Sequence, residues 1–411
     1  MDRRAGKPVD RLDYPAVPQR LSAWRFVTTF GVISMFADIV YEGARSITGP
    51  LLASLGATAL VVGVVTGIGE AGALALRLVS GPLTDRTRMF WSWTIAGYAL
   101  TVVTVPFLGM ASVLWVAATL VIAERVGKAV RSPAKDTLLS HATSVTGRGK
   151  GFAVHEAMDQ VGAITGPLVV AGMLALTQGN YLPTFAVLAI PGAAALALLF
   201  WLRRRVPHPE RYEDAADTHG TSAVRHKLQL PLKFWLYAGF SGITVSGFAT
   251  FGVLSFHMVD RGVLAPAAVP LVYAVAMAAA AAAALFSGWA YDRKGPKTLV
   301  VLPIVGAAVP MLAFTDSLVG IVLGALLWGA AVGIQESTLR AVVADLVPSP
   351  RRATAYGVYA AVLGTATAIG GTLTGYLYEV SIPMLIAVVG VIQLVALIAA
   401  APTVLRHAAQ V

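Results

Sequence analysis

The sequence contains no cysteine and little charge. None of its 411 residues is Cys, and only 13% are Asp, Glu, Lys or Arg. The first absence excludes disulfide bonds and thiolate metal sites. The second sets the chain apart from soluble domains, in which roughly a quarter of the residues are charged. The polar first 20 residues also lack the apolar core of a signal peptide, so we expect an uncleaved first span.

What the sequence has instead is a series of apolar blocks of about 20 residues, the length at which a helix crosses a bilayer. Hydrophobic residues make up 57% of the chain, and the mean hydropathy is +0.73. The alternating pattern of membrane β-strands is absent. These features predict an all-α polytopic membrane protein with twelve transmembrane helices. The spans are expected near residues 22–52, 57–80, 90–109, 112–130, 151–176, 182–203, 232–257, 266–290, 298–316, 318–342, 355–378 and 382–404.

Basic residues gather in alternate connections between these blocks. The basic connections include Arg86 and Arg88, then Arg131, Lys135, Arg148 and Lys150, then Arg203, Arg204 and Arg205, and later Arg293, Lys294, Lys297, Arg351 and Arg352. The intervening connections contribute Arg261 alone. This positive-inside pattern predicts a multi-pass protein of the inner (plasma) membrane with both termini in the cytoplasm. It also accounts for the net charge of +10, so we do not expect nucleic-acid binding.

Two short patterns recur about half a chain apart. A Gly-x-x-x-Asp-Arg frame occurs at Gly81, Asp85 and Arg86 and again at Gly288, Asp292 and Arg293. An acid followed four residues later by a base occurs at Glu124 and Lys128 and again at Glu336 and Arg340. Such repetition predicts two related six-helix bundles. We assign them to residues 1–205 and 231–411, joined by a hydrophilic cytoplasmic linker over residues 206–230.

The first of these patterns resembles the loop motif of the major facilitator superfamily of transporters, Gly-x-x-x-Asp-(Arg/Lys)-x-Gly-(Arg/Lys)-(Arg/Lys). The first copy matches at three positions and departs at Arg88 and Met89. The second copy keeps Gly295 and Lys297 as well but has Pro296 at a basic position. The resemblance covers essentially the whole chain. It implies two bundles that rock around a central site, with the two motif copies acting as gating loops.

Two further elements inside the spans support the resemblance. Arg125 and Gly127 resemble part of the family's buried-arginine motif. Gly162, Gly166 and Pro167 resemble the Gly-x-x-x-Gly-Pro element of its antiporter branches. The chain is therefore most similar to the bacterial drug:proton antiporter-type branches.

Ionisable residues inside the spans mark the candidate site, because each costs about 2.5–3.5 kcal/mol at the bilayer centre. Asp38, Glu42 and Arg45 follow one another at helical spacing and share one stripe of the first span. Glu70 is expected on the second span at a depth similar to that of Asp38. A carboxylate held there can bind and release a proton, so we expect these residues to couple protons or substrate. The alternative is static pairing, of Glu42 with Arg45 or of an acid with Arg77.

The fourth and fifth spans add a second group of charges. The fourth span carries Glu124, Arg125 and Lys128, and the fifth carries His155, Glu156 and Asp159. We expect an ion pair between Arg125 or Lys128 and Glu156 or Asp159, in a structural or gating role, with a proton relay as the alternative. Apart from Glu336 and Arg340, the spans of the second half carry far fewer ionisable residues. This predicts that the second half supplies an apolar cavity wall.

These observations predict a monomeric secondary transporter without cofactor or metal site. The resemblance implies that it works by alternating access and exports its solute by proton antiport, and the apolar second half predicts a small amphipathic solute. The alternatives are a proton-coupled uptake symporter, a lipid-type flippase, and a metal-cation carrier using Asp38, Glu42, Glu70 and Glu156 as oxygen ligands. An intramembrane hydrolase built on Ser241 in the Gly-x-Ser-Gly sequence 239–242, with His155 or His257 as base, does not suit a duplicated chain.

Overall fold

The computed structural model describes residues 21–214, 230–347 and 352–400. Every regular element in these ranges is helical, which confirms the predicted all-α class. Ten helical segments are long and apolar enough to cross a membrane. The helix α4 (Leu114–Thr146), which carries many charges, and the shorter apolar segment Lys297–Ala313 bring the described crossings to twelve.

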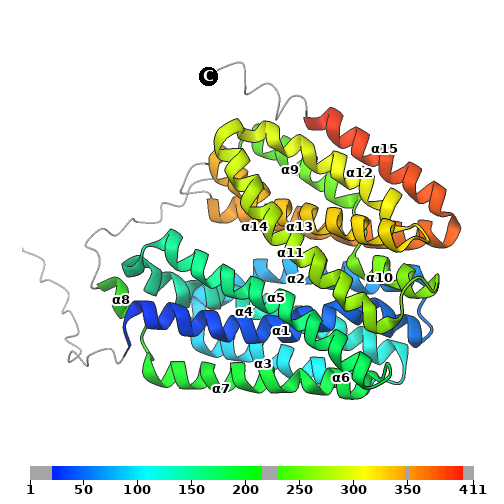
Figure 1. The fold of residues 1–411 in the computed structure, drawn as a ribbon. Coiled ribbons are helices and arrows are strands. Elements are labelled where there is room, and N and C mark those ends of the chain that lie inside the picture. Colours follow the sequence, from blue (N-terminus) through cyan, green and yellow to red (C-terminus); the bar gives the residue numbers. More distant parts are fainter. Residues whose placement is uncertain (1–20, 215–229, 348–351, 401–411) are drawn as a thin grey trace, which may run out of the picture.

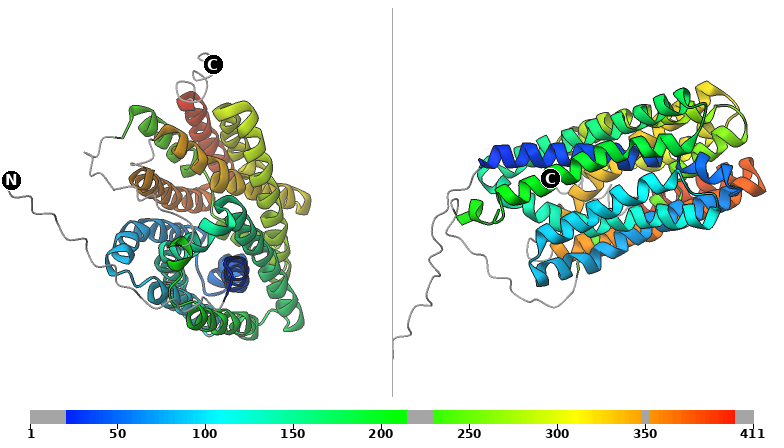
Figure 2. Two further views of the ribbon diagram at one scale, coloured as in Figure 1. Left: turned by 90° about the vertical axis from the view of Figure 1, so that its left-hand side faces the viewer. Right: turned by 90° about the horizontal axis from the view of Figure 1, so that it is seen from below.

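The helices form two bundles, one from each half of the chain (Figure 1). The first contains α1 (Ala23–Ser54), α2 (Ala59–Thr87), α3 (Phe90–Leu108), α4, α5 (Arg148–Leu176), α6 (Tyr181–Val187) and α7 (Ala189–Arg205), followed by the short α8 (Arg211–Asp214). The second contains α9 (Leu232–Ser246), α10 (Phe251–Asp260), η1 (Pro266–Ala268), α11 (Val269–Lys294), η2 (Gly295–Val300), α12 (Val301–Ala313), α13 (Leu318–Leu346), α14 (Arg352–Val380) and α15 (Ile382–Ala400). The start of α1, the helix α8 and the end of α15 lie at the same end of the molecule, and Figure 2 shows the two bundles side by side.

Local sequence signals set several helix starts. Ser22 and Thr58 accept hydrogen bonds from the backbone N–H groups of Arg25 and Val61, and so cap α1 and α2. Ser317 caps α13 in the same way. Tyr212 of α8 packs its ring on Phe26 and donates a hydrogen bond of 2.9 Å to the Leu21 carbonyl. The first residues of the predicted linker are therefore fastened to the first bundle.

The two bundles meet along helices whose small residues allow close approach. The helix α2 packs along α14, α5 packs against α11, and α1 packs against α10. A Cβ atom on Gly63 would overlap the carbonyl of Gly371, and one on Gly375 would lie about as close to the carbonyl of Ala59. At the same end, the Glu379 carboxylate accepts a hydrogen bond of 2.7 Å from the Leu60 N–H in the first turn of α2. We call this contact, formed by residues 59–67 and 368–379, the interbundle closure.

The two motif copies do not form loops, as the sequence predicted, but the last turns of α2 and α11. Both helices end at the motif's glycine position with a positive φ. Arg88 has φ 53° and ψ 18°, whereas Gly295 has φ 65° and ψ −158°. The Arg88 conformation is in the left-handed helical region, which residues with a side chain can adopt. The Gly295 conformation is in a region that is essentially reserved for glycine. This difference explains why the first copy can depart from the motif where the second cannot.

Replacing Gly295 with Ala should therefore destabilise the protein, by about 1–3 kcal/mol. The matched change Arg88→Gly should be neutral or slightly stabilising, because it removes a smaller left-handed penalty. Thermal unfolding of the purified protein in detergent measures both variants. Equal effects of the two substitutions would contradict the conformational explanation.

The crossing formed by α9 and α10 is broken at residues 247–250, where it faces the first bundle. Backbone groups freed at such a break need partners, because a membrane offers no water. The Gln393 amide donates a hydrogen bond of 2.9 Å to the Thr244 carbonyl, and the Trp328 indole N–H donates one of 2.9 Å to the Ala249 carbonyl. Two side chains thus supply hydrogen bonds to carbonyl groups at the break. The break places Thr250 at the boundary between the bundles.

Candidate functional site

A cluster of charges joins three helices of the first bundle. Glu70 of α2 lies 3.0 Å from the Arg45 guanidinium of α1 and 2.6 Å from that of Arg125 of α4, using the same carboxyl oxygen in both ion pairs. The Arg125 side chain is 4% exposed, and that of Glu70 is 23% exposed. A carboxylate shared by two guanidinium groups holds α1, α2 and α4 together at one level. We call Glu42, Arg45, Glu70 and Arg125 the charge cluster.

Aromatic and acidic groups complete the surroundings of Arg125. Its guanidinium donates a hydrogen bond to the Tyr41 hydroxyl and lies 3.4 Å from the Glu124 carboxylate. The Lys128 ammonium lies over the Tyr41 ring, 3.7 Å from its centroid. Glu124 is almost fully buried, and within the described part of the chain one of its carboxyl oxygens has no hydrogen-bond partner. Because two cations lie over the Tyr41 ring, the ring helps to offset their charge in the bilayer.

Glu42 connects the charge cluster to the other bundle. The Tyr273 hydroxyl of α11 donates a hydrogen bond of 2.5 Å to its carboxylate, and Arg45 lies 3.8 Å from the same oxygen. Both Glu42 and Tyr273 are buried. Phe251 and Trp328 pack around Tyr273, with ring centroids 4.4 Å and 6.2 Å away. An acid of one half is thus held by a phenol of the other, against an aromatic wall.

A small cavity lies beside this contact and is lined by both halves. Arg45, Glu70 and Arg125 approach it from the first bundle, while Thr250, Phe251 and Gly252 approach it from the broken crossing. The hydroxyl groups of Thr66 and Thr250 are 2.7 Å apart across the boundary. The charge cluster therefore lies at the contact between the bundles, next to irregular backbone.

A second group of charges lies nearer the start of α1 and nearer the end of α4. The Arg131 guanidinium is 3.7 Å from the Asp38 carboxylate and lies over the Tyr98 ring at 4.4 Å. Asp159 of α5 lies 3.9 Å from the Lys135 ammonium and 3.4 Å from the His155 ring. The α4 residues Glu124, Lys128, Arg131 and Lys135 recur at helical spacing, so α4 presents one charged stripe to α1 and α5.

The antiporter-like glycines pack α5 onto α1 at the level of these acids. A Cβ atom on Gly162 would overlap the Met35 carbonyl and lie 3.0 Å from the Asp38 side chain. One on Gly166 would overlap the Ile39 carbonyl. Pro167 follows inside α5 and is buried. The element thereby fixes how closely α5 approaches the helix that carries Asp38 and Glu42.

The structure brings most of the predicted site residues together but changes several partners. The ion pair predicted between Arg125 or Lys128 and an acid of α5 is wrong in its basic partner. Asp159 of α5 pairs with Lys135, while Arg125 binds Glu70. Glu70 lies level with Arg45 and not with Asp38. Asp38 is about 10 Å nearer the start of α1, at 1.5 Å per residue. The static pair of Glu42 with Arg45 is present.

Other predicted residues lie outside both groups of charges. Glu156 is exposed and accepts a hydrogen bond of 3.2 Å from Gln160. Glu336 is exposed on α13, and the Arg340 side chain lies outside the described residues. Asp85, Arg86, Asp292 and Arg293 are exposed at the ends of α2 and α11, with Arg293 lying over the Trp289 ring at 4.1 Å. These positions are remote from the contact of Glu42 with Tyr273.

Sequence reasoning missed four participants. Arg131 and Lys135 were assigned to a cytoplasmic connection, but α4 continues to Thr146 and both contact acids of other helices. Their spacing from Glu124 and Lys128 could have revealed the stripe. Tyr41 and Tyr273 lie inside apolar runs and carry no comparable signal. The second half accordingly contributes a hydroxyl group to the site, and not only an apolar wall.

The hydrolase alternative has no support in the geometry. Ser241 is fully buried within the second bundle. His155 contacts Asp159 in the first bundle, and the His257 ring nitrogens contact the Tyr378 hydroxyl at 3.1 Å and the Thr315 carbonyl at 3.2 Å. Each histidine is thus engaged away from the serine.

Comparison with solved structures shows what the fold is similar to. A crystal structure of the nucleoside transporter NupG aligns with a TM-score of 0.70 and 15% identity, covering 91% of this chain and 98% of that one. A crystal structure of the peptide transporter POT in complex with sulfate aligns with a TM-score of 0.71 and 14% identity, covering 92% and 95%. These likenesses concern the fold alone.

Comparison of sequences gives relatives and a family. An uncharacterized protein of Mycobacterium tuberculosis is 69% identical over 378 residues, which is 92% of each chain. An uncharacterized MFS-type transporter of Methanocaldococcus jannaschii is 26% identical over 369 residues, covering 86% of this chain and 89% of its own. The model of the Major Facilitator Superfamily matches residues 30–264 and 263–410, so that both bundles are covered. With the helical fold, the two related halves and the motif copies all in agreement, this multi-pass membrane protein belongs to the Major Facilitator Superfamily.

Proposed function

We propose that this transporter exports a small amphipathic solute in exchange for protons, with Glu42 as the acid that couples the two movements. The observation that carries the proposal is the hydrogen bond from Tyr273 to Glu42. In this contact a buried titratable group of one half is bound by a side chain of the other half.

The coupling follows from the chemistry of that bond. A hydrogen bond to a carboxylate is stronger than one to a neutral acid, because the acceptor is charged. A proton on Glu42 weakens its contacts with Tyr273 and with Arg45, and so loosens α1 from α11. Binding of Tyr273 and binding of a proton thereby compete for the same carboxylate, and this competition links protonation to the separation of the halves.

The other acids have supporting roles in this scheme. Asp38 of α1 and Asp159 of α5 face bases of α4 at 3.7 Å and 3.9 Å, distances at which a proton or a moving helix can replace the partner. Glu70 is tightly paired twice and serves to hold the arginines in place. The presence of these bases disfavours the metal-cation carrier, since a cation would have to displace them.

The solute class follows from the lining. The charge cluster and the hydroxyl groups of Thr66 and Thr250 lie beside Phe251, Tyr273 and Trp328. Once the bundles separate, a molecule with one polar and one aromatic or apolar part would therefore meet matching groups at the boundary. Export by antiport is favoured by the glycine element of α5, which resembles that of the antiporter branches. The basic residues at the end that carries both described chain ends support a cytoplasmic position for that end. We expect the monomer to be sufficient for transport.

Reconstituted vesicles with an imposed pH gradient test this function. We expect wild-type protein to move one member of a panel of amphipathic solutes against its gradient and to dissipate the pH gradient as it does so. Glu42→Gln should lose proton coupling, because a permanently neutral side chain cannot alternate. Tyr273→Phe should keep coupling but alter the pH dependence of transport, because the competing hydrogen bond is removed.

Glu336→Gln is the matched control, since it removes an exposed carboxylate elsewhere in the membrane domain and should leave transport unchanged. Uptake driven by the same gradient would favour the symporter instead, and movement of labelled lipid between leaflets would favour the flippase. Full pH-driven export by Glu42→Gln protein would refute the role of Glu42.

A further inference from the structure

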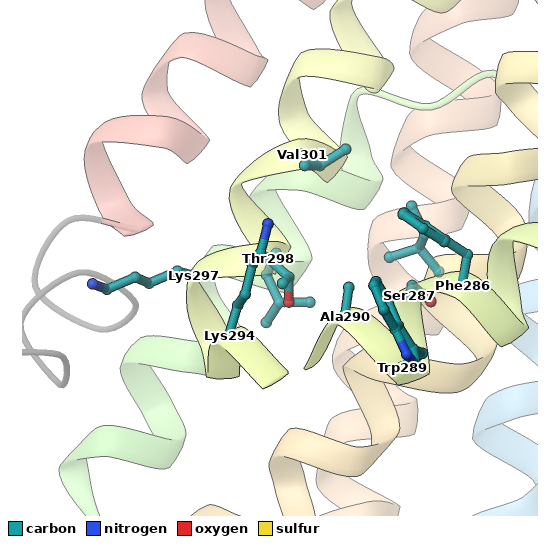
Figure 3. A pocket seen from close by; sticks show the side chains of 10 residues that line it. Phe286, Ser287, Trp289, Ala290, Lys294, Lys297, Thr298 and Val301 are labelled. Carbon is teal, nitrogen blue, oxygen red and sulfur yellow. The ribbon is translucent and has the colours of Figure 1, made fainter. Parts of the chain in front are cut away.

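A cavity of about 570 Å³ lies in the second bundle, apart from the charge cluster. It is formed by the last turns of α11, by η2, by the start of α12 and by α13. Figure 3 shows Phe286 and Trp289 on one side of it and Val301 and Thr298 on another. It belongs to the end of the molecule at which the described chain begins and ends. None of its lining residues takes part in the proposed coupling.

The wall of this cavity is apolar and opens outward from the bundle. Phe286 is 68% exposed, Trp289 is 47% exposed and Val301 is 49% exposed. The rings of Phe286 and Trp289 lie with their centroids 5.5 Å apart. Side chains of this kind on the outside of a membrane bundle face hydrocarbon, and tryptophan is favoured at the level of the headgroups. The cavity is therefore open to a lipid chain.

The rim of the cavity is basic. Among its described lining residues two are lysines, Lys294 and Lys297, and none is an acid, although the exposed Asp292 is close in sequence. In Figure 3, Lys294 extends beside Thr298, whereas Lys297 points away from the cavity. Lys294 and the Thr298 hydroxyl can thus contact one anionic group, while Lys297 adds a more distant charge.

We propose that this cavity binds an anionic phospholipid, with its phosphate at Lys294 and Thr298 and one acyl chain along Phe286, Trp289 and Val301. Basic pockets between membrane helices at the level of the headgroups select anionic lipids, because the lysines add attraction to the burial of the chain. A free phosphate would leave the apolar wall uncovered, and a zwitterionic lipid would gain little from the lysines. The structure thus contains a lipid site on the helix that carries the second motif copy.

Native mass spectrometry of the purified protein tests this inference, with phosphatidylglycerol and phosphatidylcholine of identical acyl chains as the two probes. Each lysine near the headgroups contributes about fivefold in binding, so with two lysines we expect wild-type protein to prefer phosphatidylglycerol about 25-fold. The double variant Lys294→Gln/Lys297→Gln should lose this preference. Lys150→Gln, which removes an exposed lysine at the same end of the other bundle, should retain it.

Two further measurements distinguish a bound lipid from other occupants of the cavity. Ala290→Trp places a large side chain in the cavity and should weaken retention of both lipids at this site. Glycerol phosphate, which has the headgroup chemistry without the chains, should not displace the bound lipid at millimolar concentration. Equal binding of the two lipids to wild-type protein, an unchanged preference in the double variant, or displacement by glycerol phosphate would each overturn the proposal.

Discussion

An Arg125→Gln protein should reach the membrane, unfold at a lower temperature and transport nothing. Arg125 is the buried base that neutralises Glu70 and lies against Glu124 and Tyr41. Removing one partner of a buried ion pair costs about 3–5 kcal/mol. Here Glu70 would keep Arg45 as its single base, and Glu124 would lose its ion pair. The loss should appear in the thermal unfolding of detergent-purified protein and in vesicle transport assays.

The double variant Glu70→Gln/Arg125→Gln separates the stability of the pair from its function. Removing both charges should destabilise the protein by less than the sum of the two single changes, with a coupling energy of about 0.5–3 kcal/mol. Transport should nevertheless remain absent, because Arg45 then lacks its nearest acid. Additive effects on stability, or transport at the wild-type rate in either single variant, would show that the charge cluster does not act as a unit.

A Gly63→Val protein should fail to form the interbundle closure, and its boundary between the bundles should remain accessible from that side. The added side chain would overlap the carbonyl of Gly371, which is backbone and cannot move aside as a side chain can. Gly72→Val is the matched control on the same helix, since a Cβ atom at Gly72 meets nothing within 4 Å. Export should be lost in the first variant and retained in the second.

The absence of cysteine makes this opening directly measurable. Thr48 is buried, lines the small cavity and hydrogen-bonds only within α1 in the described structure. Thr48→Cys therefore gives a single thiol at the boundary, which a reagent reaches when the bundles separate. Gly63→Val should raise its labelling by a membrane-impermeant maleimide many-fold. Glu379→Gln should raise it in the same direction by about tenfold, the effect of losing about 1.4 kcal/mol at a helix N-terminus. Unchanged labelling in both backgrounds would mean that residues 59–67 and 368–379 do not close this side.

The fold could be predicted because each span has to satisfy the bilayer by itself. Length and apolar blocks are local properties of the sequence, and they identified the helical class, whereas the motif copies pointed to the family. The helical form of the motif copies was not predicted, because charge and glycine suggest a turn while the backbone continues the helix to Arg88 and Gly295.

The candidate site could be predicted only in part, because helical spacing gives a face and not the neighbour that meets it. The stripe of Asp38, Glu42 and Arg45 followed from spacing alone. That Arg125 meets Glu70 and Lys135 meets Asp159 depends on how α2, α4 and α5 are rotated, which is set by glycine contacts between distant segments. The contribution of Tyr273 depends on the contact between the bundles and has no local signal at all.

The charged stripe of α4 also bears on how the protein is made. By length and composition α4 is not among the helices that qualify as spans, because of residues such as Arg125, Lys128 and Arg131. Lone bases at the bilayer centre oppose insertion. Their acidic partners, among them Asp38 and Glu70, lie on α1 and α2, which leave the ribosome first. The order of synthesis therefore presents the acids before the bases, and α4 enters the bilayer as the late member of a group rather than as an independent span.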